Sequence, residues 1–103
     1  MALHELTVHE AAALLQSGAI SAQELTDAQL GRLRALQPEV KAYLHVAEAQ
    51  ARRQAEEADQ VLAAARRENR TVPPLTGVPL GIKDVLSLAG QPTTCGSRLL
   101  RGY

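Results

Sequence analysis

The first two stretches of helically spaced apolar residues both begin with the same short capping pattern. Thr7 is followed three residues later by Glu10, and Ser21 is followed by Glu24. In such a capping box the hydroxyl accepts from the glutamate's backbone amide, while the carboxylate accepts from the amide of the capping residue. Apolar residues then recur every three or four positions, which predicts one helix after Thr7 and a second after Ser21.

Two helix-ending residues set the expected lengths of these helices. Gly18 follows the first apolar run, and glycine readily adopts the left-handed conformation that commonly ends a helix. Pro38 follows the second run, and proline disfavours the helical conformation of the residue before it, here Gln37. The pattern therefore predicts two short helices, joined by residues 18–20, that form a helical hairpin.

A longer helix is predicted from Val46 to Glu68, with Asn69 as its C-cap. Most of its surface is charged, and Glu48 and Arg52 have the i,i+4 spacing of a favourable ion pair. Before it, residues 41–46 alternate only loosely, which indicates a short strand or an extended entry. The narrow apolar face of the predicted helix consists of Ala47, Ala51, Ala55, Ala58, Leu62 and Ala65.

The chain changes character at Arg70, after which prolines and glycines are frequent. Prolines stiffen the backbone and glycines permit close approach or positive φ, so this part follows a defined path rather than a helix. We expect a strand over residues 78–83 (VPLGIK) and a loop over residues 91–97. A lone strand leaves its backbone groups unpaired, so this strand is expected to belong to a larger sheet.

The amino-acid composition limits the cellular compartments and the kinds of partner that are compatible with this chain. The 103 residues contain no Phe or Trp and two Tyr, so a core must be built mostly from Leu, Ala and Val. Eleven basic and eleven acidic residues cancel, unlike the basic excess of nucleic-acid-binding proteins. With one cysteine, no signal peptide and no apolar run of membrane-spanning length, we expect a cytoplasmic protein with no membrane contact.

Residues 74–97 carry the most informative chemical pattern. A lysine, Lys83, stands at the end of an apolar stretch within a Pro/Gly-rich frame. This segment resembles the amidase-signature family, whose lysine motif has the form GxPxxIKD followed by a Gly and a Thr-Thr-x-x-Ser stretch. The upstream helices and the phrase QPEVKAYLHV also resemble the start of these enzymes. The matching residues are Gly77, Val78, Pro79, Ile82, Lys83 and Asp84, then Gly90, Thr93, Thr94, Cys95 and Ser97.

The resemblance implies a fold and a domain organisation. The fold class is α/β: amino-terminal helices plus the first strand or strands of a mixed sheet covered by helices, incomplete in this chain. Residues 1–103 would form the amino-terminal part of a single domain. That part would be helical over residues 1–69 and a Pro/Gly-rich strand and loop over residues 70–103.

The resemblance also implies a mechanism, in which Lys83 is the catalytic base. Family members use a serine nucleophile, a second serine in a cis peptide, and the lysine. The amine must be neutral to accept a proton, and burial at the end of an apolar strand favours the neutral form. Both family serines belong to a Gly/Ser-rich segment that these residues lack, and Ser87 and Ser97 are too close to Lys83 to replace them. The chain alone is therefore expected to be inactive.

Substrate and partners follow only from the resemblance. It implies release of ammonia from glutamine, and two partner subunits, one of which uses the ammonia to amidate a tRNA-bound glutamate. ATP and tRNA would be handled by a partner, with no cofactor or metal in this chain. Two alternatives remain open: a stand-alone amidase acting on another small amide, and a non-catalytic helical docking module. The IKD pattern favours an enzyme, because a docking module gives no reason for it.

Other candidate nucleophiles and ligands are weaker. A cysteine nucleophile needs a histidine base, and none of His4, His9 and His45 lies near a recognisable motif, so we interpret Cys95 as a small loop residue. His4 and His9 are five residues apart, which is off the i,i+4 spacing that places two metal ligands on one helical face.

Overall fold

The computed structural model describes residues 2–43, 45–83, 86 and 92. Their elements are a short 3-10 helix, η1 (Leu3–Glu5), and three α-helices: α1 (Val8–Ser17), α2 (Ala22–Val40) and α3 (Glu48–Glu68). None of the described residues belongs to a β-strand. The helical half of the predicted fold is therefore observed, whereas the predicted sheet is not seen in this part of the chain.

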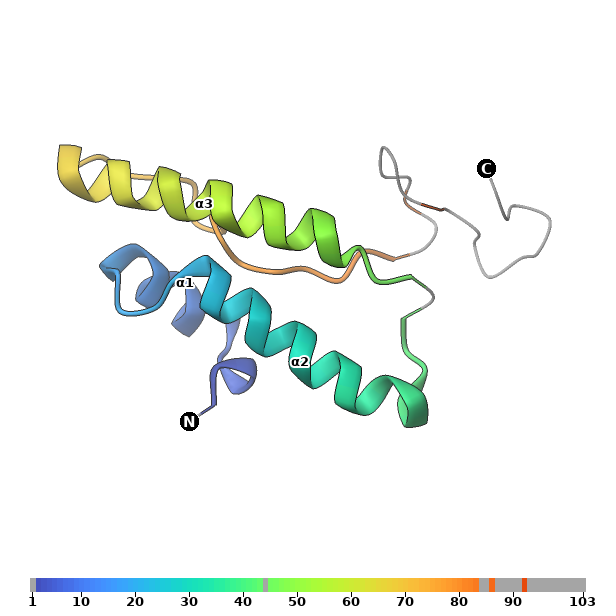
Figure 1. Ribbon diagram of the computed structural model, residues 1–103. Helices are drawn as coiled ribbons and strands as arrows, with labels where there is room; N and C mark the ends of the chain where they lie inside the picture. The colour runs from blue at the N-terminus through green and yellow to red at the C-terminus, as the bar shows by residue number, and fades with distance from the viewer. Residues whose placement is uncertain (1, 44, 84–85, 87–91, 93–103) are drawn as a thin grey trace.

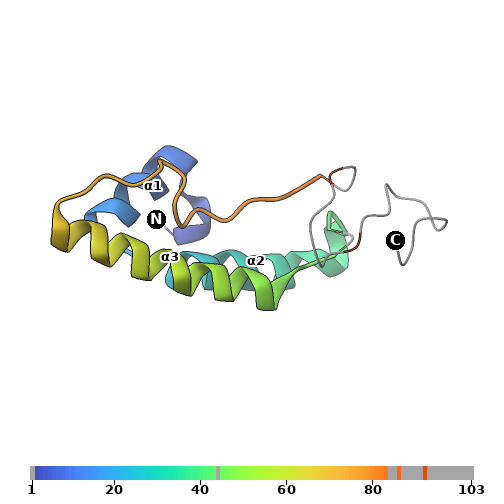
Figure 2. The ribbon, with the colours of Figure 1, turned by 90° about the horizontal axis from the view of Figure 1, so that it is seen from above.

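The three helices form two layers. α2 and α3 lie side by side and run in opposite directions (Figure 1). α1 and the segment that follows α3 both lie on one side of this pair (Figure 2). The main antiparallel pair is thus α2 with α3, and α1 packs on α3. The predicted hairpin of the first two helices is therefore not the main helix pair, because α2 packs chiefly on α3.

The core is small and is built from leucine and alanine. Leu15 of α1 and Leu25 of α2 are 0% and 1% exposed. Leu62 of α3 packs with them, as the predicted apolar face of this helix requires. Burying one leucine side chain contributes about 1.5–3 kcal/mol, so these few residues dominate the packing energy. The buried cluster consists of Ala11, Leu15, Ala22, Leu25, Ala55 and Leu62.

The predicted helix ends are confirmed at α1, at the start of α2 and at the end of α3. Both capping boxes are formed, by Thr7 with Glu10 and by Ser21 with Glu24. Gly18 ends α1 in the left-handed conformation at φ 84°, and Asn69 ends α3 at φ 52°. Local side-chain chemistry therefore determined where these helices begin and end.

Pro38 lies inside the last turn of α2, so the prediction that the helix ends before it is wrong. A proline this close to the carboxyl end removes only one late helical hydrogen bond. The last turn is held in other ways: the Lys41 N–H donates to the Gln37 carbonyl at 2.8 Å, and Lys41 ends the helix at φ 52°. The Gln37 side chain also bonds the backbone of Tyr43. These contacts outweigh the local preference of Gln37.

The predicted strand over residues 78–83 is not formed by the described residues, and of the two alternatives for residues 41–46 the described positions agree with the extended entry. Residues 78–83 run without regular secondary structure, as do residues 41–43 and 45–47. A strand is defined by backbone pairing with a neighbour, and within the described part no such neighbour is present. Sequence pattern alone could not supply that partner.

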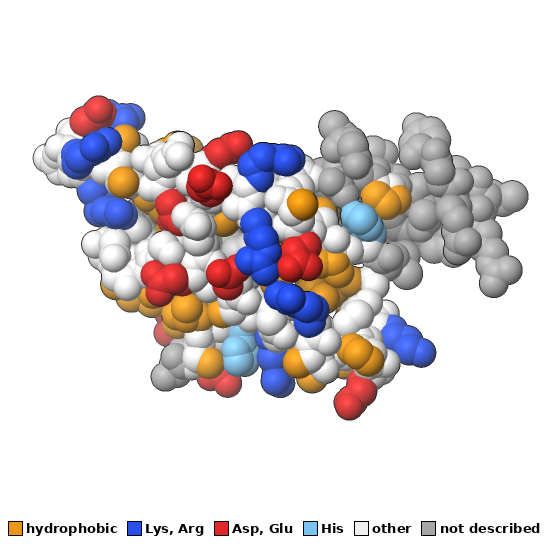
Figure 3. Space-filling model, in the orientation of Figure 1, with side chains coloured by type: hydrophobic (Ala, Val, Ile, Leu, Met, Phe, Trp, Pro, Cys, Tyr) orange, Lys and Arg blue, Asp and Glu red, His pale blue; other side chains and the backbone are white. Residues whose placement is uncertain are grey.

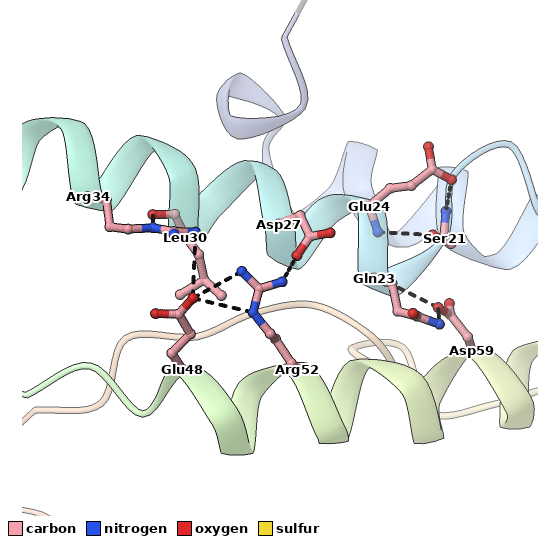
Figure 4. A network of polar contacts seen from close by, with 9 residues as sticks. All are labelled: Ser21, Gln23, Glu24, Asp27, Leu30, Arg34, Glu48, Arg52 and Asp59. Carbon is pink, nitrogen blue, oxygen red and sulfur yellow. Dashed lines mark hydrogen bonds and ion pairs between the residues drawn. The ribbon is translucent and has the colours of Figure 1, made fainter.

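Polar contacts fix the relative position of α2 and α3. Asp59 of α3 accepts from the backbone amides of Ala22 at 2.6 Å and Gln23 at 3.1 Å, at the start of α2. Further along, Arg52 pairs with Asp27 across the two helices and with Glu48 at 3.0 Å (Figure 4). The Glu48–Arg52 pair confirms the predicted spacing. Acidic and basic side chains are interspersed over the face where the two helices lie alongside each other (Figure 3).

Candidate functional site

The segment that carries Lys83 enters the helical core through a turn. The Thr76 amide donates to the Pro73 carbonyl at 3.1 Å, and the Val78 amide donates to the Leu75 carbonyl at 3.0 Å. The Thr76 hydroxyl also donates to the Pro73 carbonyl, at 2.7 Å. The proline-rich sequence thus forms a compact turn rather than an open loop.

Gly77 is the point where this turn meets the helices. Its φ is +86°, a backbone conformation that residues with a side chain rarely adopt. A Cβ atom there would lie 3.1 Å from the Ala22 Cβ and 3.3 Å from the Leu15 Cδ1. The glycine of the family motif therefore allows the backbone to lie directly on the core.

Beyond Gly77 the chain borders an open groove of about 950 Å³ between α2, α3 and the link that joins them. Several of its apolar lining residues are exposed, above all Val40, Leu80 and Leu86 at 62%, 64% and 58%. The groove is therefore an apolar surface that the described part of the chain leaves uncovered. Its other exposed apolar lining residues are Leu36, Tyr43 and Ile82.

Lys83 lies at the border of this groove and is exposed. Its carbonyl accepts from the Leu86 amide at 3.0 Å. The burial that we expected at the end of an apolar strand is not provided by the described residues, because residues 78–83 do not pair into a sheet.

The rest of the motif lies outside the described residues. This applies to Asp84 and to the predicted loop over residues 91–97, except Pro92. It also applies to the two serines near the lysine, Ser87 and Ser97. The motif residues concerned are Asp84, Gly90, Thr93, Thr94, Cys95 and Ser97.

Tyr43 is a neighbour of the lysine segment that the sequence pattern did not single out. A Cβ atom on Gly81 would lie 3.1 Å from the Tyr43 hydroxyl oxygen and 3.6 Å from its Cε1. Gly81 precedes Lys83 by two residues, so an aromatic ring from the α2–α3 link contacts the segment that leads to the lysine. The sequence feature that could have drawn attention to Tyr43 is the scarcity of aromatic residues: the chain has two, and both are tyrosine.

The histidines and carboxylates do not assemble into a metal site in the part of the chain that the structure describes. There, no group of three or more His, Cys, Asp or Glu side chains could hold a metal ion. His4 contacts Glu5 at 3.9 Å, at the amino end of the chain. No described helix is long and apolar enough to cross a membrane.

Comparison with known protein families tests the family relationship that the lysine motif indicates. The family model described as Amidase matches residues 24–103. The chain belongs to the amidase family. The matched range includes all but the first two residues of α2, together with α3, the turn at Gly77 and Lys83.

Individual relatives extend the similarity over the whole chain. It is 46% identical over 101 residues to the A subunit of glutamyl-tRNA(Gln) amidotransferase from Roseiflexus sp. (strain RS-1), and 48% identical to its counterpart from Roseiflexus castenholzii. These matches cover 98% of this chain and 20% of each relative. The protein of the same name from Desulfatibacillum aliphaticivorans is 46% identical over 103 residues. The amidase-family chain thus spans about a fifth of the length of these relatives. No solved structure matches it significantly.

Proposed function

We propose that this chain is the amino-terminal part of an amidase that releases ammonia from glutamine for the transamidation of Glu-tRNA(Gln), with Lys83 as the catalytic base. The observation that carries the proposal is the IKD motif inside the amidase-family match, in a chain 46–48% identical to amidotransferase A subunits. The rest of the domain would supply the serine nucleophile, the second serine and the mixed sheet.

The exposed apolar groove supports this domain organisation. A lysine that acts as a base must be neutral, which requires an apolar environment. Lys83 borders a groove in which Val40, Leu80 and Leu86 are more than half exposed. In the proposed enzyme the remaining domain would cover this groove, bury the lysine and pair residues 78–83 into the sheet. The chain by itself would be inactive.

The partners follow from the same proposal. They are the B and C subunits of the amidotransferase in the cytoplasm, with tRNA and ATP handled outside this chain. The balanced charge, eleven basic and eleven acidic residues, agrees with a chain that does not bind tRNA directly.

A stand-alone amidase acting on another small amide is the second candidate. The family match by itself supports a stand-alone amidase and an amidotransferase subunit equally, because that match is to amidases in general. Substrate-lining residues in the rest of the domain would decide between the two.

The first experiment reads the coding sequence beyond the codon for Tyr103. We expect a Gly/Ser-rich stretch with two serines. A stop codon there would exclude serine–lysine hydrolysis by this chain alone, and the docking-module alternative would then be tested.

The second experiment measures ammonia release from glutamine and from other small amides by the longer protein. We expect Lys83→Ala to lower kcat about 10²–10⁴-fold, the usual contribution of a general base. Lys41→Ala is the matched control, since Lys41 and Lys83 are the two lysines of the chain and Lys41 ends α2. Equal activity of the two variants would contradict the role of Lys83.

A further inference from the structure

The side chain of Tyr43 contacts the exposed backbone of Gly81, two residues before Lys83. The ring comes from the α2–α3 link and lies against Gly81, close enough that a Cβ atom there would meet the hydroxyl oxygen at 3.1 Å. That separation is tighter than ordinary van der Waals contact. A methyl group on Gly81 would therefore displace the Tyr43 ring by a few tenths of an ångström.

Tyr43 is itself held on the end of α2 by Gln37. The Tyr43 amide donates to the Gln37 Oε1 at 3.2 Å, and the Gln37 Nε2 donates to the Tyr43 carbonyl. Gln37 belongs to the last helical turn, where its own carbonyl accepts from the Lys41 amide at 2.8 Å. Although the ring is 44% exposed, its backbone is thus tied to a helix.

The lysine segment is consequently held at two points. Gly77 lies on the core formed by Leu15 and Ala22, and Gly81 lies under Tyr43. The residues on either side of Gly81 add little, because Leu80 and Ile82 are 64% and 44% exposed. The second point is nearer to Lys83, since Gly81 precedes the lysine by two residues.

We propose that Tyr43 is a positioning residue for Lys83 and that Gln37 acts through Tyr43. This inference rests on the proposed function, since the position of Lys83 affects a rate only if the lysine is the base. A base must lie within about 2.6–3.2 Å of the proton it removes. Misplacement by about 1 Å can lower a rate about 10²-fold, so a contact two residues away has catalytic consequences.

The contact itself is tested in the 103-residue chain by NMR. An aromatic ring shifts the resonances of protons that lie over it, so the α-protons of Gly81 report on Tyr43. We expect displaced Gly81 shifts in the wild type and in Tyr43→Phe, which keeps the ring, and loss of the displacement in Tyr43→Ala. Unchanged Gly81 shifts in Tyr43→Ala would overturn the inference without bearing on the proposed function.

The catalytic consequence is tested in the longer amidase that contains this chain. We expect Tyr43→Ala and Gln37→Ala to lower kcat for ammonia release about 10-fold or more, with KM nearly unchanged. Tyr43→Phe should restore most of the rate. Gln60→Ala, an exposed glutamine of α3 outside the groove, is the control and should keep the wild-type rate.

A double-mutant cycle separates positioning from general destabilisation. Gly81→Ala should lower kcat in the wild type, because the new methyl group displaces the ring, and should have no further effect in Tyr43→Ala. Additive losses of kcat from Gly81→Ala and Tyr43→Ala would overturn the inference. A wild-type kcat for Tyr43→Ala, when the Lys83→Ala enzyme is inactive, would also overturn it. An active Lys83→Ala enzyme would instead overturn the proposed function, and this inference with it.

Discussion

At the scale of single residues, Gly77 links the family motif to the fold. Its positive φ and its contact with Ala22 are two separate reasons why a side chain is disfavoured there. The first is a property of the backbone and the second a property of the packing. A glycine that a motif search identifies as part of a catalytic signature is thus also a structural requirement of the helical core.

Gly77→Ala is expected to destabilise the chain by about 1–3 kcal/mol, the cost of a left-handed conformation for a residue with a side chain. The contact with Ala22 can only add to this cost. Urea denaturation followed by circular dichroism measures it. Gly31→Ala is the control, because Gly31 lies inside α2 with nothing within 4 Å of the new Cβ. That variant should be stabilised by about 0.5–1 kcal/mol, and destabilisation of both variants would contradict the argument.

At the scale of elements, the helices are set by contacts at their ends. Each of α1 and α2 begins with a capping box from its own sequence. α2 receives a second cap from Asp59 of α3, and Arg66 of α3 donates to the Leu15 carbonyl at 3.1 Å near the end of α1. The longest helix thus caps both of the others, which holds their ends in register.

The α1 capping box should make this helix sensitive to acid. The pKa of Glu10 is lowered from its usual 4.5, chiefly because its carboxylate accepts from the Thr7 backbone amide. A carboxylate whose pKa is lower in the folded state than in the unfolded state stabilises the folded state at a pH above the unfolded-state pKa. This stabilisation is lost as the pH falls through the folded-state pKa. We therefore expect α1 to lose amide protection below about pH 4.5, measured by hydrogen exchange. Glu10→Gln removes the titrating group, so its α1 protection should not change over this range.

Asp59→Ala should destabilise the chain by about 1–2 kcal/mol, because two backbone amides at the start of α2 lose their acceptor. The measurement is again the urea midpoint with circular dichroism. Asp27→Ala is the comparison, since Asp27 makes only an exposed ion pair with Arg52, and exposed pairs contribute little. An equal loss in both variants would show that charge in general, rather than the cap, is responsible.

At the scale of the whole molecule, the described residues have a covered side and an uncovered one. α1, η1 and the turn at Gly77 bury part of the α2–α3 pair, while the groove near Lys83 stays open. Contiguous exposed apolar surface of this kind is uncommon on isolated domains.

The open groove should bind an apolar fluorescent dye in the 103-residue chain. Because Leu80 and Val40 are among its most exposed apolar residues, Leu80→Asn and Val40→Asn together should lower the dye signal at least about twofold without loss of helical circular dichroism. Val61→Asn is the control: Val61 is 49% exposed on α3 but lies outside the groove. An equal loss with Val61→Asn would mean that the dye does not report on the groove.

The sequence by itself determined the features that depend on neighbouring residues. Thr7, Ser21, Gly18 and Asn69 act within one helical turn, so their capping roles were predicted correctly. The motif around Lys83 likewise identified the family from its residue order. How that lysine is used remains a prediction, because its chemistry depends on side chains outside these residues.

Tertiary structure decided the features that depend on residues far apart in the chain. Residues 78–83 have no strand partner among the described residues, and such a partner would have to come from elsewhere in the chain. The Asp59 cap joins positions 37 residues apart, a separation that no local pattern reports. The contact of Tyr43 with Gly81 was unpredictable for the same physical reason, since it exists only when α2, α3 and the following segment pack together.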